Sequence, residues 1–337
     1  MVFEQPGLDR ACQQRQLPGL ARQALRMSAM HRILITGKNG QVGHELQRSL
    51  APLGELVATD RQELDLSQSG ERIEQALDRH HPDIIVNPAA YTAVDKAESD
   101  EETANAVNAD AVGAIARWAA RRGALLVHYS TDYVFNGDGE RPWREDDATG
   151  PQSAYGRSKL AGEEAIRLAA PRHLILRTSW VFGAHGANFL KTMLKLGQER
   201  DALKVVDDQI GAPAPAALIA DITAELIREY LAKPAGFAFG TYHLAPHGET
   251  SWQGYARYLL QRAASSGLPL RINPADIQGI PSSDYPLPAK RPANSRLCCD
   301  KLEKTFNISL PEWKSGVDQV LAELLNGAPD NKGIPRE

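Results

Sequence analysis

Residues 33–43 read Ile33-Leu34-Ile35-Thr36-Gly37-Lys38-Asn39-Gly40-Gln41-Val42-Gly43, and this stretch decides the fold class. Its apolar start is typical of a short buried strand, and a helical pattern follows as far as Leu50. Glycines at a spacing of three and three permit a tight turn, a close backbone approach to a phosphate and close packing of helix on strand. The helix N-terminus would also offer free N–H groups to a pyrophosphate. The stretch predicts a dinucleotide site formed by Gly37, Asn39, Gly40, Gln41, Val42 and Gly43. The alternative is a glycine-rich turn that binds no ligand.

The second apolar run, residues 56–59, leads into an acidic and a basic residue, Asp60 and Arg61. An acidic residue about 20 positions after the glycines typically binds ribose hydroxyls, whereas an Arg nearby accommodates the 2′-phosphate of NADP. Because both are present, the residues leave NADH and NADPH open. Asp65 and Leu66 are candidates for the adenine side of the site, and a helix cap at Asp65 explains that stretch equally well.

Strands and helices alternate along the first half of the chain, which favours a doubly wound parallel α/β sheet of the Rossmann type. The expected strands are at residues 83–87, 125–129 and 174–178, and the expected helices are at 71–80, 95–122 and 155–170. Small residues, Ala89 and Ala90, follow the strand at 83–87 and precede Tyr91. They would let a dinucleotide pass over the sheet edge, so all three are candidate cofactor contacts.

The alternation loosens after Gly183. Helices are expected near 188–199, 215–231, 252–264 and 316–325, with short strands at 204–206 and 241–244. We therefore expect a cofactor-binding domain at 30–183, with later segments returning to it, and a smaller mixed α/β substrate-binding lobe made mainly of 184–325. Residues 1–29 are expected to be a disordered N-terminal extension, and 326–337 a disordered tail.

Two stretches carry the chemistry. The first, Ser130-Thr131-Asp132-Tyr133-Val134-Phe135, follows the strand at 125–129, and the second, Tyr155-Gly156-Arg157-Ser158-Lys159, opens a helix. A Tyr and a Lys four residues apart share one helix face, and an ammonium beside a phenol lowers the phenol's pKa from about 10. Such a phenol is a useful proton donor, and a Thr131 or Ser130 hydroxyl could bind the same substrate oxygen. A chance surface pair is the alternative.

Composition narrows the function classes. The chain has 337 residues, of which 42% are hydrophobic and 24% charged, as in ordinary globular proteins. A formal net charge of -4 argues against a nucleic-acid partner, and no apolar run approaches the roughly 20 residues of a membrane span. Three cysteines, Cys12, Cys298 and Cys299, form neither a disulfide framework nor a zinc motif, so a reducing, cytoplasmic location is expected.

Taken together, the motifs resemble the extended short-chain dehydrogenase/reductase superfamily and, within it, the family of dTDP-4-dehydrorhamnose reductases. The stretches that carry this resemblance are 37–46, 87–98, 130–135, 177–183, 208–213 and 290–295. The resemblance implies an enzyme that uses NADPH or NADH to reduce the C4 ketone of dTDP-4-dehydro-L-rhamnose to dTDP-L-rhamnose, a precursor of cell-surface polysaccharides such as O-antigen. Residues 1–29 lie outside the family pattern.

The same resemblance implies roles for individual residues. Tyr155 would be the general acid that protonates the C4 oxyanion. Lys159 would lower its pKa and hold the nicotinamide ribose, and Thr131 would position the keto oxygen. Further substrate contacts are expected from Asp132, Tyr133, Trp180 and Arg291. Core packing is the alternative for the two aromatic residues, and a solvated loop charge is the alternative for the arginine.

A metal site and two rival functions are the alternatives to this interpretation. Glu45 resembles a position that some family members use for magnesium at a dimer contact, but no further ligand can be matched, so no metal site is predicted and Mg²⁺ and a homodimer stay unassigned. A nucleotide-sugar epimerase or dehydratase would share the Tyr and Lys, although a dehydratase usually carries a carboxylate pair where Thr131 is followed by Asp132 alone. A non-catalytic regulatory subunit of methionine adenosyltransferase would be favoured by loss of Tyr155 or Lys159, and both are present.

Overall fold

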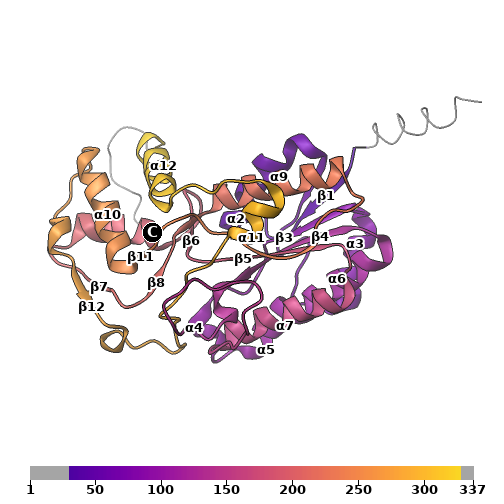
Figure 1. The fold of residues 1–337 in the computed structure, drawn as a ribbon, viewed down its shortest axis with the longest axis horizontal. Coiled ribbons are helices and arrows are strands. Elements are labelled where there is room, and N and C mark those ends of the chain that lie inside the picture. The colour runs from indigo at the N-terminus through magenta and orange to yellow at the C-terminus, as the bar shows by residue number, and fades with distance from the viewer. Residues whose placement is uncertain (1–29, 328–337) are drawn as a thin grey trace, which may run out of the picture.

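A six-stranded parallel sheet forms the centre of the larger part of the molecule (Figure 1). The computed structural model describes residues 30–327, so the expectations for 1–29 and for most of the tail at 326–337 lie outside the described residues. The expected start of that tail is too early by one residue, because Asn326 still belongs to the last helix. The strand order is β10-β5-β4-β3-β1-β2, which confirms the predicted doubly wound sheet. Its strands are β1 (Arg32–Ile35), β2 (Glu55–Ala58), β3 (Ile84–Asn87), β4 (Leu125–Thr131), β5 (His173–Thr178) and β10 (Gly240–His243).

Helices cover both faces of this sheet (Figure 1). One face carries α2 (Gln41–Leu50), α9 (Ala216–Ala232) and α11 (Asp300–Phe306), and the other carries α3 (Gly70–His80), α6 (Ala111–Arg122) and α7 (Ala154–Ala169). Successive residues of β1 serve opposite faces: Ile33 and Ile35 join the core under α2 and α9, and Leu34 joins the core under α3 and α6. Because both faces are covered, the strand sequence is apolar without alternation.

A second, smaller hydrophobic core lies inside the lobe beside the sheet. Leu190, Tyr255, Leu259, Trp313 and Val317 are buried together there. The lobe helices are α8 (Phe189–Glu199), α10 (Trp252–Ser265) and α12 (Trp313–Asn326). Its strand pairs are β7 (Lys204–Val206) with β12 (Gln278–Ile280) and β8 (Ile210–Gly211) with β11 (Thr250–Ser251), while β6 (Val181–Phe182) pairs with β9 (Ala214–Pro215). Short turns are η1 (Ala51–Leu53), η3 (Asp132–Val134), η4 (Pro274–Asp276) and η5 (Ser282–Asp284).

Much of the second half of the chain returns to the first. Helix α9 packs along α2, and β10 extends the sheet by pairing in parallel with β5. The strand expected at 241–244 is therefore part of the main sheet. Local periodicity could not show this, because a strand's pattern records how many of its faces are buried and not which neighbour it pairs with.

The single helical region expected at 95–122 is interrupted once, at residues 98–100. α4 (Val94–Ala97) precedes this break, and α5 (Glu101–Asn105), a π-helical turn η2 (Ala106–Asp110) and α6 follow it as one continuous helix. Asn108 lies in the π turn and is buried, and its amide bonds both backbone groups of Tyr91 and the hydroxyl of Ser158. The wider turn aims this amide at two segments that flank the predicted site, as π turns at functional sites often do.

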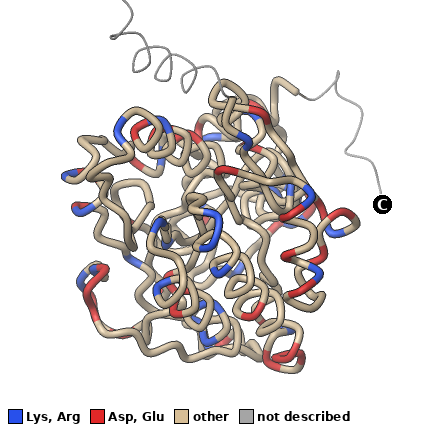
Figure 2. The backbone as a smooth tube through the Cα atoms, turned by 90° about the vertical axis from the view of Figure 1, so that its right-hand side faces the viewer, with Lys and Arg blue, Asp and Glu red and all other residues tan. Residues whose placement is uncertain are grey.

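Charges of both signs are intermingled over the backbone in the view of Figure 2. That distribution agrees with the formal net charge of -4. Among the helices of residues 30–327, none combines the length and the apolar character that a membrane span needs.

Helix α7 touches η2 through a glycine, which generates the first prediction. A Cβ on Gly162 would overlap the carbonyl oxygen of Asn108, so Gly162→Ala has to push α7 away from that turn. We expect a loss of about 1–3 kcal/mol in the free energy of unfolding, measured by urea denaturation.

The matched control is another helical glycine at the same helix pair. A Cβ on Gly113 would lie 3.1 Å from the end of the flexible Arg117 side chain and 3.4 Å from the Ala165 Cβ. Gly113→Ala should therefore change stability little, since a gain of about 1 kcal/mol in helix propensity offsets the small shifts that these two neighbours have to make. Equal effects of the two substitutions would contradict the packing argument.

Candidate active site

The ends of β1 and β3 form a crevice where the chain changes direction. From β1 the chain continues to β2 on one side of the sheet, and β3 lies on the other side, so the two strand ends meet at a topological switch point. Gly37 follows β1 with φ 61°, and a Cβ there would lie 3.0 Å from the Cβ of Ala89, which follows β3. A Cβ on Gly43 would overlap the Gly37 carbonyl oxygen. Only glycines fit this close turn.

This crevice has the features that a dinucleotide requires. Helix α2 begins after Gly40 with no side-chain cap, so its first N–H groups are available to a phosphate. A pocket of about 450 Å³ opens beside it. Eight of the predicted cofactor residues line that pocket: Gly37, Asp60, Arg61, Asp65, Leu66, Ala89, Ala90 and Tyr91. The residues present therefore fit a nucleotide cofactor.

The other predicted cofactor residues support the turn. The Gln41 amide donates to the Val181 carbonyl at 3.4 Å and accepts from the Asn188 amide at 2.9 Å, so the turn is tied to the segment that leads into the lobe. The Asn39 amide lies 3.4 Å from the Asp60 carboxylate. Val42 packs against the main core. These contacts hold the backbone of the turn in place.

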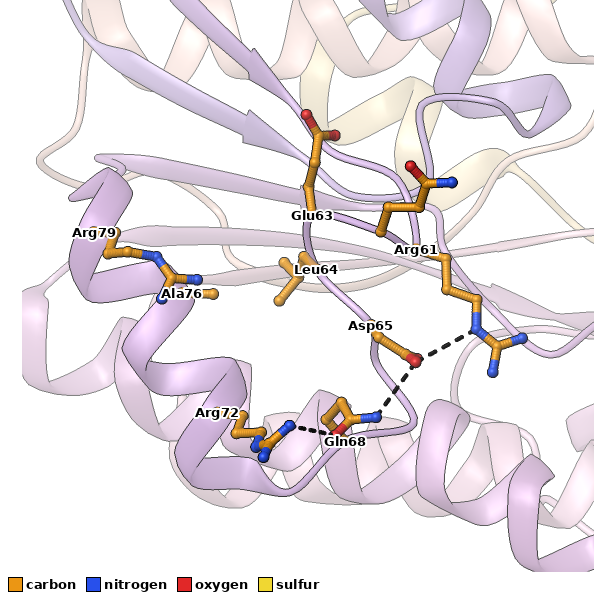
Figure 3. Close-up of a pocket in the computed structure, with 9 residues that line it drawn as sticks. Arg61, Glu63, Leu64, Asp65, Gln68, Arg72, Ala76 and Arg79 are labelled. Carbon is orange, nitrogen blue, oxygen red and sulfur yellow. Dashed lines mark hydrogen bonds and ion pairs between the residues drawn. The ribbon is translucent and has the colours of Figure 1, made fainter.

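The adenosine side of the pocket carries both signs of charge. The Lys38 ammonium lies 2.6 Å from Glu63 and 3.5 Å from Asp60. The pKa of Asp60 is lowered, first by a hydrogen bond from the Gln62 N–H and also by the Lys38 charge. Arg61 points toward Asp65, with its Nε 3.4 Å from the carboxylate (Figure 3), and its side chain is 79% exposed. The Asp60 carboxylate, expected to bind ribose hydroxyls, and the exposed Arg61 guanidinium, expected to bind a 2′-phosphate, therefore line the same pocket.

Helix α7 presents Tyr155 and Lys159 on its buried face. The helix is capped by Ser153, whose hydroxyl accepts from the Gly156 N–H at 3.1 Å. Tyr155 is 9% exposed and Lys159 only 2%. The Lys159 ammonium donates to the Tyr129 carbonyl at 2.7 Å and lies 3.1 Å from Nε2 of His128. Tyr155 and Lys159 are therefore not a chance pair on the surface, and the Lys159 ammonium is directed at β4.

The pKa of Tyr155 is raised, whereas the sequence led us to expect that Lys159 lowers it. Burial is the main cause, the charge of Asp132 adds to it, and a hydrogen bond with the Thr131 side chain acts in the opposite sense. Lys159 makes no contribution to this shift, although it lies on the same face of α7. A raised pKa keeps the phenol protonated at neutral pH, which is the form a general acid needs.

The turn after β4 arranges the remaining polar groups. The Thr131 hydroxyl accepts from the Tyr133 N–H at 3.2 Å and donates to the Asp132 carboxylate at 3.0 Å. Burial raises the pKa of Asp132 to about 6. The Tyr133 ring meets the Tyr155 ring edge to face at 5.5 Å. Ser130 precedes Thr131 on β4, so its side chain points to the opposite face of the strand and does not share the position of Thr131; within residues 30–327 its buried hydroxyl has no hydrogen-bond partner.

Two predicted substrate residues lie where the lobe joins the sheet. Trp180 has φ 48°, a strained conformation for a bulky residue, and its ring stacks on Trp252 at 3.7 Å. Arg291 forms an ion pair with Asp95 at 2.6 Å, and its side chain is 18% exposed. Arg291 is therefore more than a solvated loop charge, but a diphosphate would have to share it with Asp95.

Sequence reasoning missed several polar residues that organise the site. They are Asn87, His128, Asn108 and Asp95. A signal was available for two of them, because Asn87 ends the apolar run of β3 and His128 interrupts that of β4. A polar side chain in a strand buried on both faces has to find a partner.

Glu45, the residue considered for magnesium, forms an ion pair with Arg48 at 3.3 Å. Across residues 30–327 no three His, Cys, Asp or Glu side chains come together as a metal site would require.

Comparisons with known proteins place this geometry in a family. Residues 30–326 match the RmlD substrate binding domain family. The chain is 49% identical to dTDP-4-dehydrorhamnose reductase of Escherichia coli K12, over 87% of this chain and 97% of that one. It is 47% identical to dTDP-4-dehydrorhamnose reductase of Burkholderia thailandensis, over 88% and 99%.

Solved structures agree. The Bacillus anthracis dTDP-4-dehydrorhamnose reductase in complex with NADP has a TM-score of 0.79 and 32% identity, over 87% of this chain and 99% of that one. A Clostridium acetobutylicum dTDP-4-dehydrorhamnose reductase gives 0.79 and 36%, over 87% and 99%. The crevice, the buried Tyr and Lys and similarities that cover at least 87% of each chain have one explanation: the chain belongs to the RmlD family of dTDP-4-dehydrorhamnose reductases.

Proposed function

We propose that this protein reduces the C4 ketone of dTDP-4-dehydro-L-rhamnose to give dTDP-L-rhamnose, with NADPH or NADH as the reductant. The observation that carries the proposal is the position of Tyr91. It lines the cofactor pocket, and it also packs in the cluster that contains Tyr155. The predicted proton donor therefore lies next to the place where the nicotinamide end of a dinucleotide would leave the crevice.

We assign each site residue a separate role in the ketone reduction. The bound cofactor supplies the hydride. We assign Tyr155 as the acid that protonates the oxygen as negative charge develops on it, and its raised pKa keeps its proton available. Lys159 keeps one N–H for the nicotinamide ribose, because β4 occupies the rest of its bonding capacity. Thr131 lies beside Tyr155 and would orient the keto oxygen.

The thymidine-diphosphate sugar would lie between sheet and lobe. We assign the stacked Trp180 and Trp252 to the wall of that site, because backbone strain at Trp180 is retained only where the surroundings demand it. Asp132 and Tyr133 follow Thr131 toward the same space, and Arg291 would exchange part of its pairing with Asp95 for the diphosphate.

The alternative functions, an epimerase, a dehydratase or a regulatory subunit, have weaker support. Epimerases on this scaffold share the fold at low identity: the Thermus thermophilus UDP-glucose 4-epimerase is 19% identical, which speaks for the fold alone. A carboxylate pair typical of dehydratases is missing at Thr131, where Asp132 stands alone. A non-catalytic regulatory role would not require a buried Tyr155 and Lys159.

We place the reaction in the cytoplasm, where NADPH and nucleotide sugars are found. Two adjacent cysteines, Cys298 and Cys299, are both free thiols, as expected in a reducing compartment.

Replacing the acid tests the mechanism. Tyr155→Phe should lower kcat about 10²–10⁴-fold and leave cofactor affinity nearly unchanged, since only the donated proton is removed. Turnover is followed by loss of NADPH absorbance with dTDP-4-dehydro-L-rhamnose, and cofactor affinity by fluorescence titration. Tyr258→Phe is the control, because Tyr258 bonds Asp318 in the lobe and should keep full turnover. A Tyr155→Phe enzyme with normal kcat would remove Tyr155 from the acid role.

The adenosine side predicts how the two cofactors are told apart. Arg61→Ala should raise the KM for NADPH about tenfold and leave the KM for NADH unchanged, because only NADPH carries a 2′-phosphate for the guanidinium. Arg72 lines the neighbouring pocket of about 330 Å³ together with Arg61, but it bonds Gln68 at 3.1 Å (Figure 3). Arg72→Ala should therefore alter neither KM. Equal effects on both cofactors in Arg61→Ala would contradict the assignment.

A further inference from the structure

A chain of buried side chains crosses the sheet beneath the proposed site. Thr36, at the end of β1, donates its hydroxyl hydrogen to Oδ1 of Asn87 on β3 at 2.6 Å. Nδ2 of Asn87 lies 3.1 Å from Nδ1 of His128 on β4, and Nε2 of His128 lies 3.1 Å from Nζ of Lys159. His128 and Asn87 are 0% and 1% exposed. The reduction described above gives neither of them a task.

The hydrogens of this chain can be counted. The Ala89 N–H donates to the Thr36 oxygen at 3.3 Å, so the Thr36 hydroxyl hydrogen is free for Oδ1 of Asn87. Asn87 then donates from Nδ2 to Nδ1 of His128. A neutral imidazole that accepts at Nδ1 carries its hydrogen on Nε2, facing Lys159. An ammonium has no lone pair to accept that hydrogen, so this arrangement fits only a free amine.

Turning the Asn87 amide over gives the opposite arrangement. Oδ1 then accepts from Nδ1–H of His128, and the lone pair on Nε2 accepts from a Lys159 ammonium. In both arrangements Lys159 donates to the Tyr129 carbonyl and keeps one further N–H. What differs between them is the charge on Lys159, the tautomer of His128 and the orientation of Asn87. The three are therefore coupled.

We propose that His128 is a positioning residue for the reduction: held by Asn87, it determines whether Lys159 is retained as an ammonium or as a free amine beside Tyr155. The geometry favours such a coupling because each member has a single partner on each side and water is excluded from the chain. This inference rests on the proposed function for its kinetic consequence only.

The surroundings of Lys159 leave its ammonium and free-amine forms close in free energy. Burial lowers the pKa of Lys159 to about 8, and the charge of Glu163, one turn further along α7, acts in the opposite sense. Glu163 is itself shared between Arg177 on β5, at 2.7 Å, and Arg167, at 2.9 Å. Burial and the Lys159 charge hold the pKa of His128 well below its usual range, so the imidazole is neutral.

The lowered pKa of Lys159 gives the direction of the expected pH effect on turnover. The ammonium is present below about pH 8 and is lost as the pH rises through that value, so the alkaline limb of kcat/KM reports the loss of the charge. A partner that accepts a hydrogen bond from the ammonium moves this alkaline limb to higher pH. Removing that acceptor moves the limb to lower pH.

Two substitutions should move the alkaline limb in opposite directions. His128→Leu removes the acceptor, and we expect the limb to fall by about one pH unit. Asn87→Asp provides a carboxylate that accepts from Nδ1–H and fixes the lone pair on Nε2, so the limb should rise. His128→Gln can still accept at its amide oxygen and should restore the wild-type limb.

His243→Leu is the matched control for simple loss of packing. His243 is also 0% exposed, and within residues 30–327 neither of its ring nitrogens has a hydrogen-bond partner. This variant should lower the melting temperature without moving the limb. A limb unchanged in both His128→Leu and Asn87→Asp, or moved equally by His243→Leu, would overturn the proposal.

A spectroscopic measurement tests the coupling without turnover or substitution in the sample. In the full-length protein labelled with ¹⁵N-histidine, the His128 signals, assigned by their loss in His128→Gln, should report Nδ1–H below pH 8 and Nε2–H above it. A single tautomer across that range would refute the inference whatever the kinetics of the variants show. Because this readout needs no substrate, failure of the proposed reduction and failure of the inference remain distinguishable.

Discussion

Holding the Lys159 side chain in a fully buried position is the constraint on which the site depends. An ammonium taken out of water costs several kcal/mol unless its donors are satisfied. β4 satisfies two of them, through the Tyr129 carbonyl and through His128. For this to happen α7 has to lie close against its neighbours, and Gly162 allows it by leaving room for the Asn108 carbonyl. The hydrogen bonds of Lys159 therefore depend on the close packing of α7 against its neighbours.

The same requirement extends across the sheet. His128 can serve Lys159 only if Asn87 holds its other nitrogen, and Asn87 is held by Thr36, the residue before the first glycine of the phosphate turn. The turn proposed for the pyrophosphate and the lysine proposed for the ribose are thus joined by buried hydrogen bonds. Where the lobe meets the sheet, the Arg291–Asp95 pair and the Trp180–Trp252 stack tie the two together.

Local signals in the sequence were sufficient for the cofactor pocket and for every strand of the main sheet except β10. Apolar runs followed by Gly37, Asp60 and Ala89 marked the carboxyl ends of three parallel strands, and those ends meet in one crevice. The candidate residues for catalysis were found because Tyr155 and Lys159 share one helix face. Their place in the reaction remains a proposal that the variants test.

Partners distant in sequence could not be predicted. Arg291 and Asp95 are 196 residues apart, and no periodic pattern connects them. The π turn at Asn108 depends on contacts with Tyr91 and Ser158 that a helical pattern does not encode. The pKa of Tyr155 rises because burial outweighs any effect of the nearby ammonium, and burial becomes known only when the fold is known.

The central claim is that hydride moves from the cofactor to C4 of a thymidine-diphosphate sugar. The most direct measurement uses NADPH deuterated on the transferred position, with dTDP-4-dehydro-L-rhamnose, and locates the label by NMR. The account predicts one deuterium at C4 of dTDP-L-rhamnose for each NADPH oxidised. A sugar product formed without net oxidation of cofactor, or a product without label at C4, would contradict it.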